Sequence, residues 1–442
     1  MATEVFTSVA AVVLVLGIMI LVHEWGHFMA AKLFGVRVEV FSFGFGPRLW
    51  GSRRGPTDYR LSALPLGGYV KMAGDNPVEA RTGAPDEFLS KPRWQRAIIA
   101  VAGPSMNMIM AVVLITGSLF LVGVPYPAYL SRPVEVVGFS SKAVGAEAGI
   151  RPGDRLVDLD GIRNPTWEQA RLHLEDAKPA TQLRMEFQRG QQALDLTLTP
   201  PDPRDVEAIL GYPPVPAVVD RVAPGMPAER AGLRRDDEIV GINGEPVVSW
   251  LQVVELIRAS NGQPVQLVIR RGDRRISLQI RPVLGQSSRG EQVWQIGTLA
   301  RTEVSYRRLG LFDSVERGVL ASAEAGRMIF GIVGKIFVGK VSLRQLQGVI
   351  GIARESGDAV RRGPLDLLNL MAVISMNLAI LNLLPIPILD GGHILLLAIE
   401  GGLRRDLSVA VKERFVQVGL VFLLVIFAIV MYNDVLRLLP SR

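Results

Sequence analysis

The stretch LVHEWGHFMAAKLFG (residues 21–35) places two histidines and a glutamate directly after the apolar residues 5–20. Ionisable groups inside a membrane segment are costly and usually functional. On an α-helix, His23 and His27 are four residues apart, so they share one face and can bind one metal ion. Glu24 lies beside this pair, where its carboxylate can act as a general base on a metal-activated water. The stretch therefore predicts a site for one Zn²⁺ ion in a membrane helix.

A catalytic zinc site needs a third protein ligand and an open fourth position. We expect the third ligand to be Asp390, which follows the apolar segment NLAILNLLPIPIL (377–389) and precedes two glycines expected to form a tight turn. The prolines end the helical hydrogen bonding of that segment, so Asp390 should lie near its cytoplasmic end, at the depth of the two histidines. Glu400 is an alternative ligand, although its apolar surroundings make it less suitable. His393 could support the site or only cap a helix.

Asn382 lies in the same apolar segment. An amide at that depth could hydrogen-bond the backbone of a substrate or an oxyanion. The alternative is a hydrogen bond between helices, which polar residues often make in membranes.

The 442 residues suggest two to four domains, and 49% of them are hydrophobic, which fits a membrane protein with a sizeable aqueous part. Cysteine is absent, which excludes disulfides, thiolate zinc sites and cysteine nucleophiles. The net charge is +7, but the chain has no basic helix or group of stacking aromatic residues. We therefore expect no nucleic acid as a partner.

Four stretches have the ~20 residues that cross a bilayer: roughly 5–33, 97–123, 366–385 and 414–433. Eleven Lys and Arg against six Asp and Glu lie between residues 32 and 96, which places that segment in the cytoplasm. Both termini and residues 124–365 are then outside. A fifth stretch, 311–338, is interrupted by six charges. It favours amphipathic helices on the membrane surface, within a linker of residues 285–365, over a further span.

The outer segment contains an internal repeat, in which EAGIRPGDRLVDLDG (147–161) aligns with RAGLRRDDEIVGING (230–244). We predict two α+β modules, at 124–204 and 205–284, whose pattern resembles PDZ domains. In the second copy, Leu210, Gly211 and Tyr212 resemble the loop whose backbone amides bind a peptide C-terminus. The alternative is that both modules are spacers that bind nothing.

VRVEVFSFGFGPRLW (36–50) and YRLSALPLGGYVKM (59–72) alternate in hydrophobicity, with glycines where backbones can approach closely. They predict a β-hairpin over about residues 35–72. The fold class is thus a polytopic α-helical membrane protein of four spans, with this membrane-associated hairpin and two outer PDZ-like modules. Residues 1–123 and 366–442 form the two halves of the membrane core.

With HEWGH in a first span and NLLPIPILDGG in a later one, the chain resembles the site-2 protease family of intramembrane zinc metalloproteases. The resemblance implies that His23, His27 and Asp390 bind zinc, that Glu24 activates the water and that Asn382 assists catalysis or substrate binding. It also implies a hairpin folded back into the membrane near the metal. A free strand edge at residues 41–46, with contacts from Phe43, Gly44, Phe45 and Gly46, would pair with an unwound substrate helix.

The resemblance further implies an enzyme of the bacterial inner membrane that makes a second cut in a single-span substrate. That substrate would be an anti-sigma factor already trimmed by another protease, and the periplasmic PDZ-like pair would exclude untrimmed substrates. Three other functions remain to be weighed against this one. They are a membrane-anchored metalloprotease that cuts soluble proteins, a non-enzymatic adaptor with a structural metal, and a metal transporter.

Overall fold

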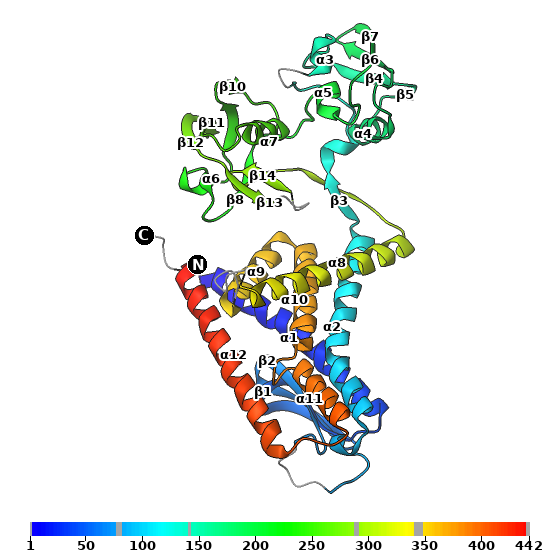
Figure 1. Cartoon of the computed structure of the whole chain (residues 1–442), viewed down its shortest axis with the longest axis vertical. Coiled ribbons are helices and arrows are strands. Elements are labelled where there is room, and N and C mark those ends of the chain that lie inside the picture. The colour runs from blue at the N-terminus through cyan, green and yellow to red at the C-terminus, as the bar shows by residue number, and fades with distance from the viewer. Residues whose placement is uncertain (1, 77–81, 140–142, 287–290, 340–347, 439–442) are drawn as a thin grey trace. The chain divides into compact units, whose positions relative to one another are not determined.

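The computed structural model describes every residue except 1, 77–81, 140–142, 287–290, 340–347 and 439–442. The chain divides into two compact units (Figure 1). One consists of Met1–Val124 with Arg308–Arg442, and the other of Pro125–Arg307. The two halves of the predicted membrane core therefore come together in one unit.

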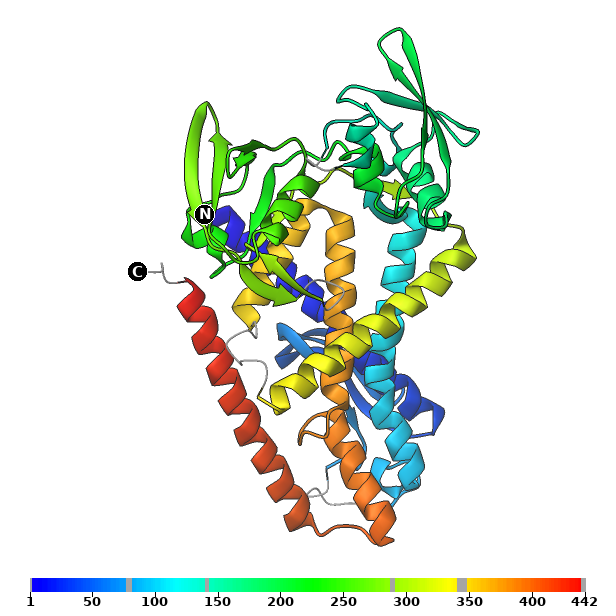
Figure 2. The same cartoon turned by 45° about the horizontal axis from the view of Figure 1, so that its top comes forward.

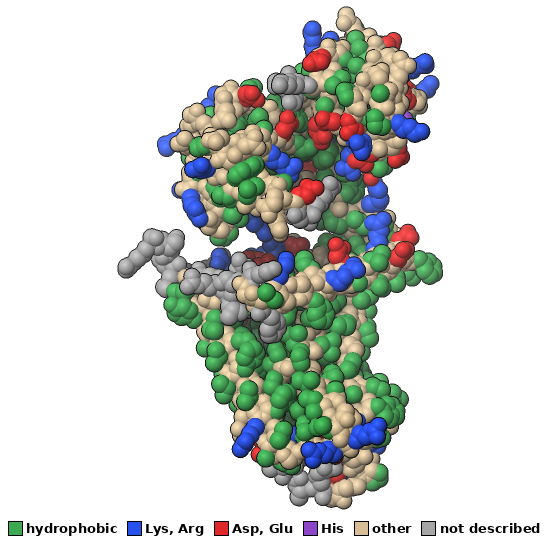
Figure 3. All heavy atoms as spheres, viewed as in Figure 1, with side chains coloured by type: hydrophobic (Ala, Val, Ile, Leu, Met, Phe, Trp, Pro, Cys, Tyr) green, Lys and Arg blue, Asp and Glu red, His purple; other side chains and the backbone are tan. Residues whose placement is uncertain are grey.

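Four helices of the first unit are long and apolar enough to cross a membrane. They are α1 (Ala2–Leu33), α2 (Arg93–Leu121), α10 (Pro364–Leu383) and α12 (Val409–Leu438). They lie where the four spans are expected from the sequence, which confirms four long apolar helices at those places. Apolar side chains cover the visible middle of this unit, and Lys and Arg gather at its end near α11 (Asp390–Leu403) (Figures 1 and 3).

Helices α1 and α2 approach each other closely at Gly26, within the HEWGH stretch. A Cβ atom at Gly26 would lie 2.3 Å from the backbone oxygen of Ala102, so only glycine permits this crossing. Helix α2 also packs along α10. The three helices thus bring the late part of α1 next to the chain that follows α10.

Helix α8 (Leu311–Phe337) is one continuous helix that lies across α2 and α10 (Figures 1 and 2). Small residues form its packing face: Ser314, Gly318 and Ser322 are buried at every fourth position. A second helix, α9 (Val349–Arg362), completes the predicted linker and packs on α1. That both lie on the membrane surface stays a prediction.

The last span is bound to α9 through Asp434, a carboxylate only 3% exposed. Its two oxygens accept hydrogen bonds from the amides of Gly348, Ile350 and Gly351, each at 3.1 Å. These amides belong to the start of α9, where backbone donors have no partner within the helix. Most of the rest of α12 is exposed, because only 6% of its apolar stretch is buried.

The predicted hairpin consists of β1 (Val38–Arg54) and β2 (Thr57–Met72), and both strands bend. Residues 48–54 pair with 57–62, whereas 38–43 lie between 58–61 and 68–72. Phe43, for example, faces Leu61 on one side and Gly68 on the other. The expected free edge at residues 41–46 is therefore wrong for Phe41 to Phe43, because that segment is the centre of the sheet. Among the described strands, residues 68–72 form an edge.

The second unit contains two modules with the same topology. The first sheet has the order β5 (Ile162–Arg163), β4 (Arg155–Leu159), β6 (Leu183–Arg189), β7 (Gln192–Leu198). The second has β10 (Glu245–Pro246), β9 (Glu238–Ile242), β11 (Val265–Arg271), β12 (Arg274–Ile280). Helices also recur at matching places, α3 (Val144–Glu147) and α4 (Trp167–Asp176) in the first module, α6 (Pro227–Arg230) and α7 (Trp250–Ala259) in the second. The internal repeat is confirmed.

An ion pair with a buried carboxylate and a partly exposed arginine is repeated as well. Arg189 donates two 2.7 Å hydrogen bonds to the Asp154 carboxylate, which also accepts from the amide of Arg151. Arg271 and Asp237 form the same pair in the second module. The Arg189 guanidinium holds the pKa of Asp154 below its usual value.

The boundary between the modules differs from the expected 204/205. Helix α5 (Val206–Leu210) places Val206, Ile209 and Leu210 in the core of the first module. The remaining elements are the strand pairs β3 (Val124–Pro127) with β16 (Val304–Arg307), β8 (Val219–Val222) with β15 (Thr298–Ala300), and β13 (Val283–Gln286) with β14 (Gln292–Gln295), and the short helices η1 (Phe88–Ser90) and η2 (Ala128–Ser131).

Candidate metal centre

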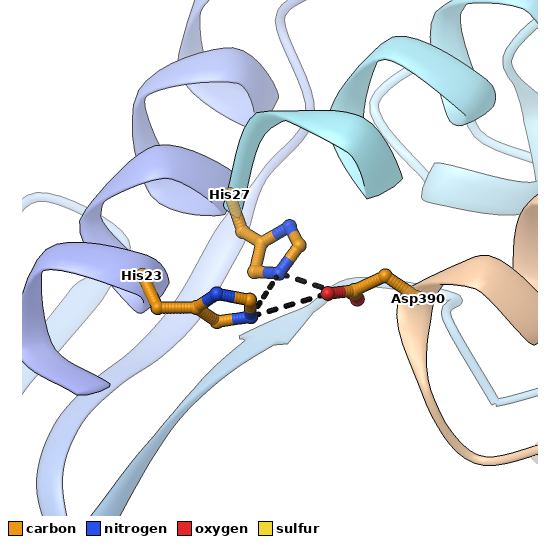
Figure 4. A group of neighbouring side chains, drawn as sticks. All are labelled: His23, His27 and Asp390. Carbon is orange, nitrogen blue, oxygen red and sulfur yellow. Dashed lines mark hydrogen bonds and ion pairs between the residues drawn. The ribbon is translucent and has the colours of Figure 1, made fainter. Parts of the chain in front are cut away.

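Three side chains from the two ends of the chain converge on one point (Figure 4). His23 and His27 lie one turn apart on α1, and Asp390 begins α11. The two Nε2 atoms are 3.2 Å apart. Asp390 places Oδ2 3.2 Å from Nε2 of His23 and Oδ1 3.4 Å from Nε2 of His27. The three residues that the sequence predicts as metal ligands therefore lie together.

These distances fit one zinc ion. Zinc in proteins is tetrahedral with Zn–N and Zn–O bonds of about 2.0–2.1 Å, which places neighbouring ligand atoms about 3.3 Å apart. The two Nε2 atoms are 3.2 Å apart, close to that value. Asp390 faces them with both oxygens, Oδ2 at 3.2 Å from His23 and Oδ1 at 3.4 Å from His27, and with one ligand atom taken per residue the three lie within 4.8 Å of one another. Two imidazoles and one carboxylate are also a ligand set that suits zinc and leaves a fourth position open.

The imidazole of His27 is fixed by α2. Its Nδ1 lies 2.7 Å from the carbonyl oxygen of Ile99, which accepts the Nδ1 proton and leaves Nε2 for a metal. Gly103, one turn further along α2, makes room for the ring, because a Cβ there would lie 2.3 Å from Nε2 of His27. The sequence interpretation missed Gly103, since a glycine in an apolar span has no local signal of what it faces.

Two asparagines surround His23. The Asn382 amide nitrogen on α10 lies 3.4 Å from Nε2 of His23, which places Asn382 at the site as expected. The Asn107 amide on α2 lies 3.4 Å from the other ring nitrogen, Nδ1. Asn107 was also missed, although a lone amide in an apolar span is a recognisable signal of a polar contact between helices.

Asp390 is positioned by a sharp bend that precedes it. The tight turn expected at Gly391 and Gly392 is not formed. Both glycines instead lie at the helical start of α11. A Cβ on Gly391 would lie 2.1 Å from the Leu384 oxygen, and one on Gly392 2.4 Å from the Ile386 oxygen. The two glycines therefore let the chain after α10 fold against the start of α11. The carboxylate also benefits from the positive end of that helix.

Glu24 stands where a general base is needed. It lines a cavity of about 300 Å³ together with His23, Asn382, Gly67 and Gly68. Val70, in the edge segment of β2, lines the neighbouring cavity together with Glu24. Glu24 is thus held beside the three ligand atoms, and the sheet edge runs past it.

A larger cavity, of about 950 Å³, meets the other side of the site. His393 and Glu400 line it without joining the three ligand atoms. Glu400 is instead bound to Lys412 at 2.6 Å and to the amide of Leu407 at 3.0 Å. Glu400 is therefore not the third ligand.

The model of peptidase family M50 matches residues 11–426 of the chain. The chain belongs to peptidase family M50. This M50 peptidase is 34% identical to the regulator of sigma-E protease RseP of Salmonella typhimurium, an alignment that covers 98% of this chain and 100% of that protein. It is 35% identical to protease RseP of Yersinia pestis (98% and 100%) and 32% identical to a putative zinc metalloprotease of Vibrio cholerae (99% and 100%).

Among solved structures, the M50 peptidase is similar to the PDZ domain of an SdrC-like protein from Listeria monocytogenes. The identity is 22%, the TM-score is 0.17, and the match covers 19% of this chain and 85% of that one. A similarity of this size does not establish the fold of either module.

Two groups of predicted substrate contacts differ from expectation. Of the residues Phe43, Gly44, Phe45 and Gly46, only Phe45 lines the cavities described for the M50 peptidase. In the second group, the Gly211 amide donates to the Glu207 oxygen and the Tyr212 amide to the Gly138 oxygen, both within the first module. With these amides occupied and Leu210 buried, the structure does not support a carboxylate-binding loop at 210–212.

Proposed function

We propose that this M50 peptidase is an intramembrane zinc metalloprotease that hydrolyses a peptide bond within a membrane segment of a single-span protein. The observation that carries the proposal is the convergence of His23 and His27, on a helix that can span a membrane, with Asp390, which follows another such helix, and with Glu24 beside them. Bound zinc would supply Lewis-acid polarisation and a water acidic enough to lose a proton near neutral pH.

The chain's own residues complete the reaction. Glu24 takes the proton of the attacking water, whose oxygen bonds to the scissile carbonyl carbon. It then delivers that proton to the leaving nitrogen as the C–N bond breaks. The Asn382 amide, 3.4 Å from Nε2 of His23, is placed to donate a hydrogen bond to the carbonyl oxygen as charge develops on it.

The edge of β2 is the surface on which the substrate would be held. A membrane helix must unwind before it can be cut, and each unpaired backbone group then costs several kcal/mol in lipid. Residues 68–72 have a ladder partner on one side only among the described strands. Gly68 lines the smaller cavity at Glu24, and Tyr69, Val70 and Met72 line the larger one, which Glu24 also borders. We infer that an extended substrate segment pairs with this edge, in place of the segment 41–46 expected from the sequence.

The absence of cysteine from the chain makes this placement testable. Tyr69→Cys, in the edge segment, should form a disulfide with a cysteine near the scissile bond of a bound substrate. Trp50→Cys, 74% exposed on the far segment of β1, is the control. Equal crosslinking at both positions, or crosslinking at Trp50 alone, would contradict the placement.

The names of the relatives suggest the pathway. Because relatives that are 34% identical over 98% of this chain carry the name regulator of sigma-E protease RseP, we propose an anti-sigma factor as substrate, trimmed first by another protease. The enzyme would lie in the inner membrane, with both termini and the two PDZ-like modules in the periplasm and α8 and α9 on the membrane surface. The modules would exclude untrimmed substrates.

The deciding experiment compares wild-type protein with Glu24→Gln in detergent. Both should bind one zinc per chain, and only the wild type should cut a single-span model substrate. If the variant cleaves at the wild-type rate, Glu24 is not the base. If neither protein binds zinc, the proposed function fails.

A further inference from the structure

Asn107 is the most deeply buried polar side chain next to the metal centre, with 0% exposure. It stands on α2 and faces Nδ1 of His23, the ring nitrogen that points away from the other ligand atoms. Its backbone is fixed independently, because the Ser375 hydroxyl on α10 donates a 2.8 Å hydrogen bond to its carbonyl oxygen. Asn107 therefore occupies a defined place between α1 and α10.

The hydrogen bonding of this amide is incomplete as the side chain is oriented. The nitrogen Nδ2 lies 3.4 Å from His23 Nδ1. The oxygen Oδ1 is buried and has no hydrogen-bond partner among the described residues. The two ends of an asparagine amide have nearly the same shape, so hydrogen bonding and not shape decides which end faces a neighbour.

The chemistry of His23 decides the orientation. A neutral imidazole that offers Nε2 to a metal carries its proton on Nδ1, and that N–H needs an acceptor. In His27 the acceptor is the Ile99 carbonyl. At His23, the Asn107 amide nitrogen would place its N–H groups against the Nδ1 N–H, and two donors cannot bond each other. The Asn107 amide oxygen in the same place can accept the Nδ1 proton.

We propose that Asn107 is a positioning residue for His23, with Oδ1 accepting the Nδ1 proton so that the lone pair of Nε2 points at the metal. Asn107 then does for His23 what the Ile99 carbonyl does for His27, and α2 orients both rings of the HEWGH motif. The inference rests on the metal-binding role of His23 in the proposed function, and it assigns no direct contact between Asn107 and metal or substrate.

The test measures zinc affinity of the full-length protein in detergent, by competition with a chelator of known affinity. Asn107→Leu keeps the approximate volume but removes the acceptor, and should weaken zinc binding about 10- to 100-fold, as removal of such a supporting partner typically does. Asn107→Asp restores an acceptor and should recover most of that loss. Visible spectra of the cobalt-substituted proteins should show altered d–d bands for Asn107→Leu only.

Ser375→Ala is the matched control. It removes a hydrogen bond to the same residue's backbone without touching the side chain that faces His23. It should leave the zinc affinity within about twofold, since a partner that does not touch a ligand does not tune the metal. The thermal unfolding of all metal-free variants shows whether a loss of zinc reflects a loss of folding.

Three results would overturn the inference: wild-type zinc affinity in Asn107→Leu, an Asn107→Asp protein that binds as weakly as Asn107→Leu, or a Ser375→Ala protein that loses as much affinity. Failure of the wild type to bind zinc would instead reject the proposed function.

Discussion

Replacing Gly103 with alanine tests whether the approach of α2 to the metal centre is as close as the structure indicates. The added Cβ would lie 2.3 Å from Nε2, 2.6 Å from Cε1 and 2.8 Å from Cδ2 of His27. An ordinary contact begins at 3.4 Å, so the ring must move by about 1.1 Å or α2 must withdraw by the same amount.

A movement of that size removes a ligand. Zinc–ligand bonds tolerate deviations of only about 0.2 Å, so His27 could no longer reach the position that it shares with His23 and Asp390. We expect zinc affinity to fall by at least about 100-fold, more than for loss of a supporting partner. Cleavage of a single-span substrate should fall by at least about 100-fold as well, as a 1 Å misplacement can cost that much.

Gly117 provides the control on the same helix. A Cβ there meets nothing within 4 Å, so Gly117→Ala should retain zinc and activity, and it gains about 1 kcal/mol of helix propensity. Both variants would be assayed for zinc affinity, cleavage and metal-free thermal unfolding. Wild-type zinc affinity and cleavage in a folded Gly103→Ala protein would refute the reasoning.

Three further outcomes are expected. Asp154→Asn should destabilise the first module by about 2 kcal/mol at neutral pH, because it weakens a charge-assisted pair with Arg189; limited proteolysis of the full chain would show it. The lowered pKa of Asp154 means that this stabilisation exists above the unfolded pKa and is lost as pH falls through the folded one, so wild type and variant should converge in acid. Asp434→Asn should lower the thermal unfolding midpoint by several degrees, whereas the exposed Tyr432→Phe should not; equal midpoints would contradict the role of Asp434 at α9. Chelation of the metal should also lower the midpoint, and added zinc should restore it in proportion to ln(1 + [Zn]/Kd); a midpoint unaffected by chelator would contradict a folded-state metal site.

The chemistry of the site could be predicted from the sequence because it is encoded in local spacing. His23 and His27 share a helix face by periodicity alone, and the apolar length of each span sets the depth at which Asp390 meets them. The same locality explains the repeat, since each module carries its own turn residues.

What could not be predicted depends on partners distant in sequence. Alternating hydrophobicity marks residues 36–50 and 59–72 as strands, but it does not show that both strands bend. Because they bend, the segment around Phe43 lies in the centre of the sheet and residues 68–72 form an edge. An apolar residue such as Leu210 could belong to the core of either module. Only the packing of α5 shows that it belongs to the first one. Asn107 and Gly103 face the histidines because of how α1 crosses α2, a geometry that Gly26 permits without specifying.

Because His23 and His27 lie in the first tenth of the chain and Asp390 lies far along it, the three side chains can meet only after synthesis has passed residue 390. A growing chain that has already placed HEWGH in the bilayer holds the base and two imidazoles but no carboxylate to close the set. A chain truncated before its final two helices likewise lacks the third predicted ligand, Asp390. The order of synthesis therefore delays the complete ligand set until most of the chain has been made.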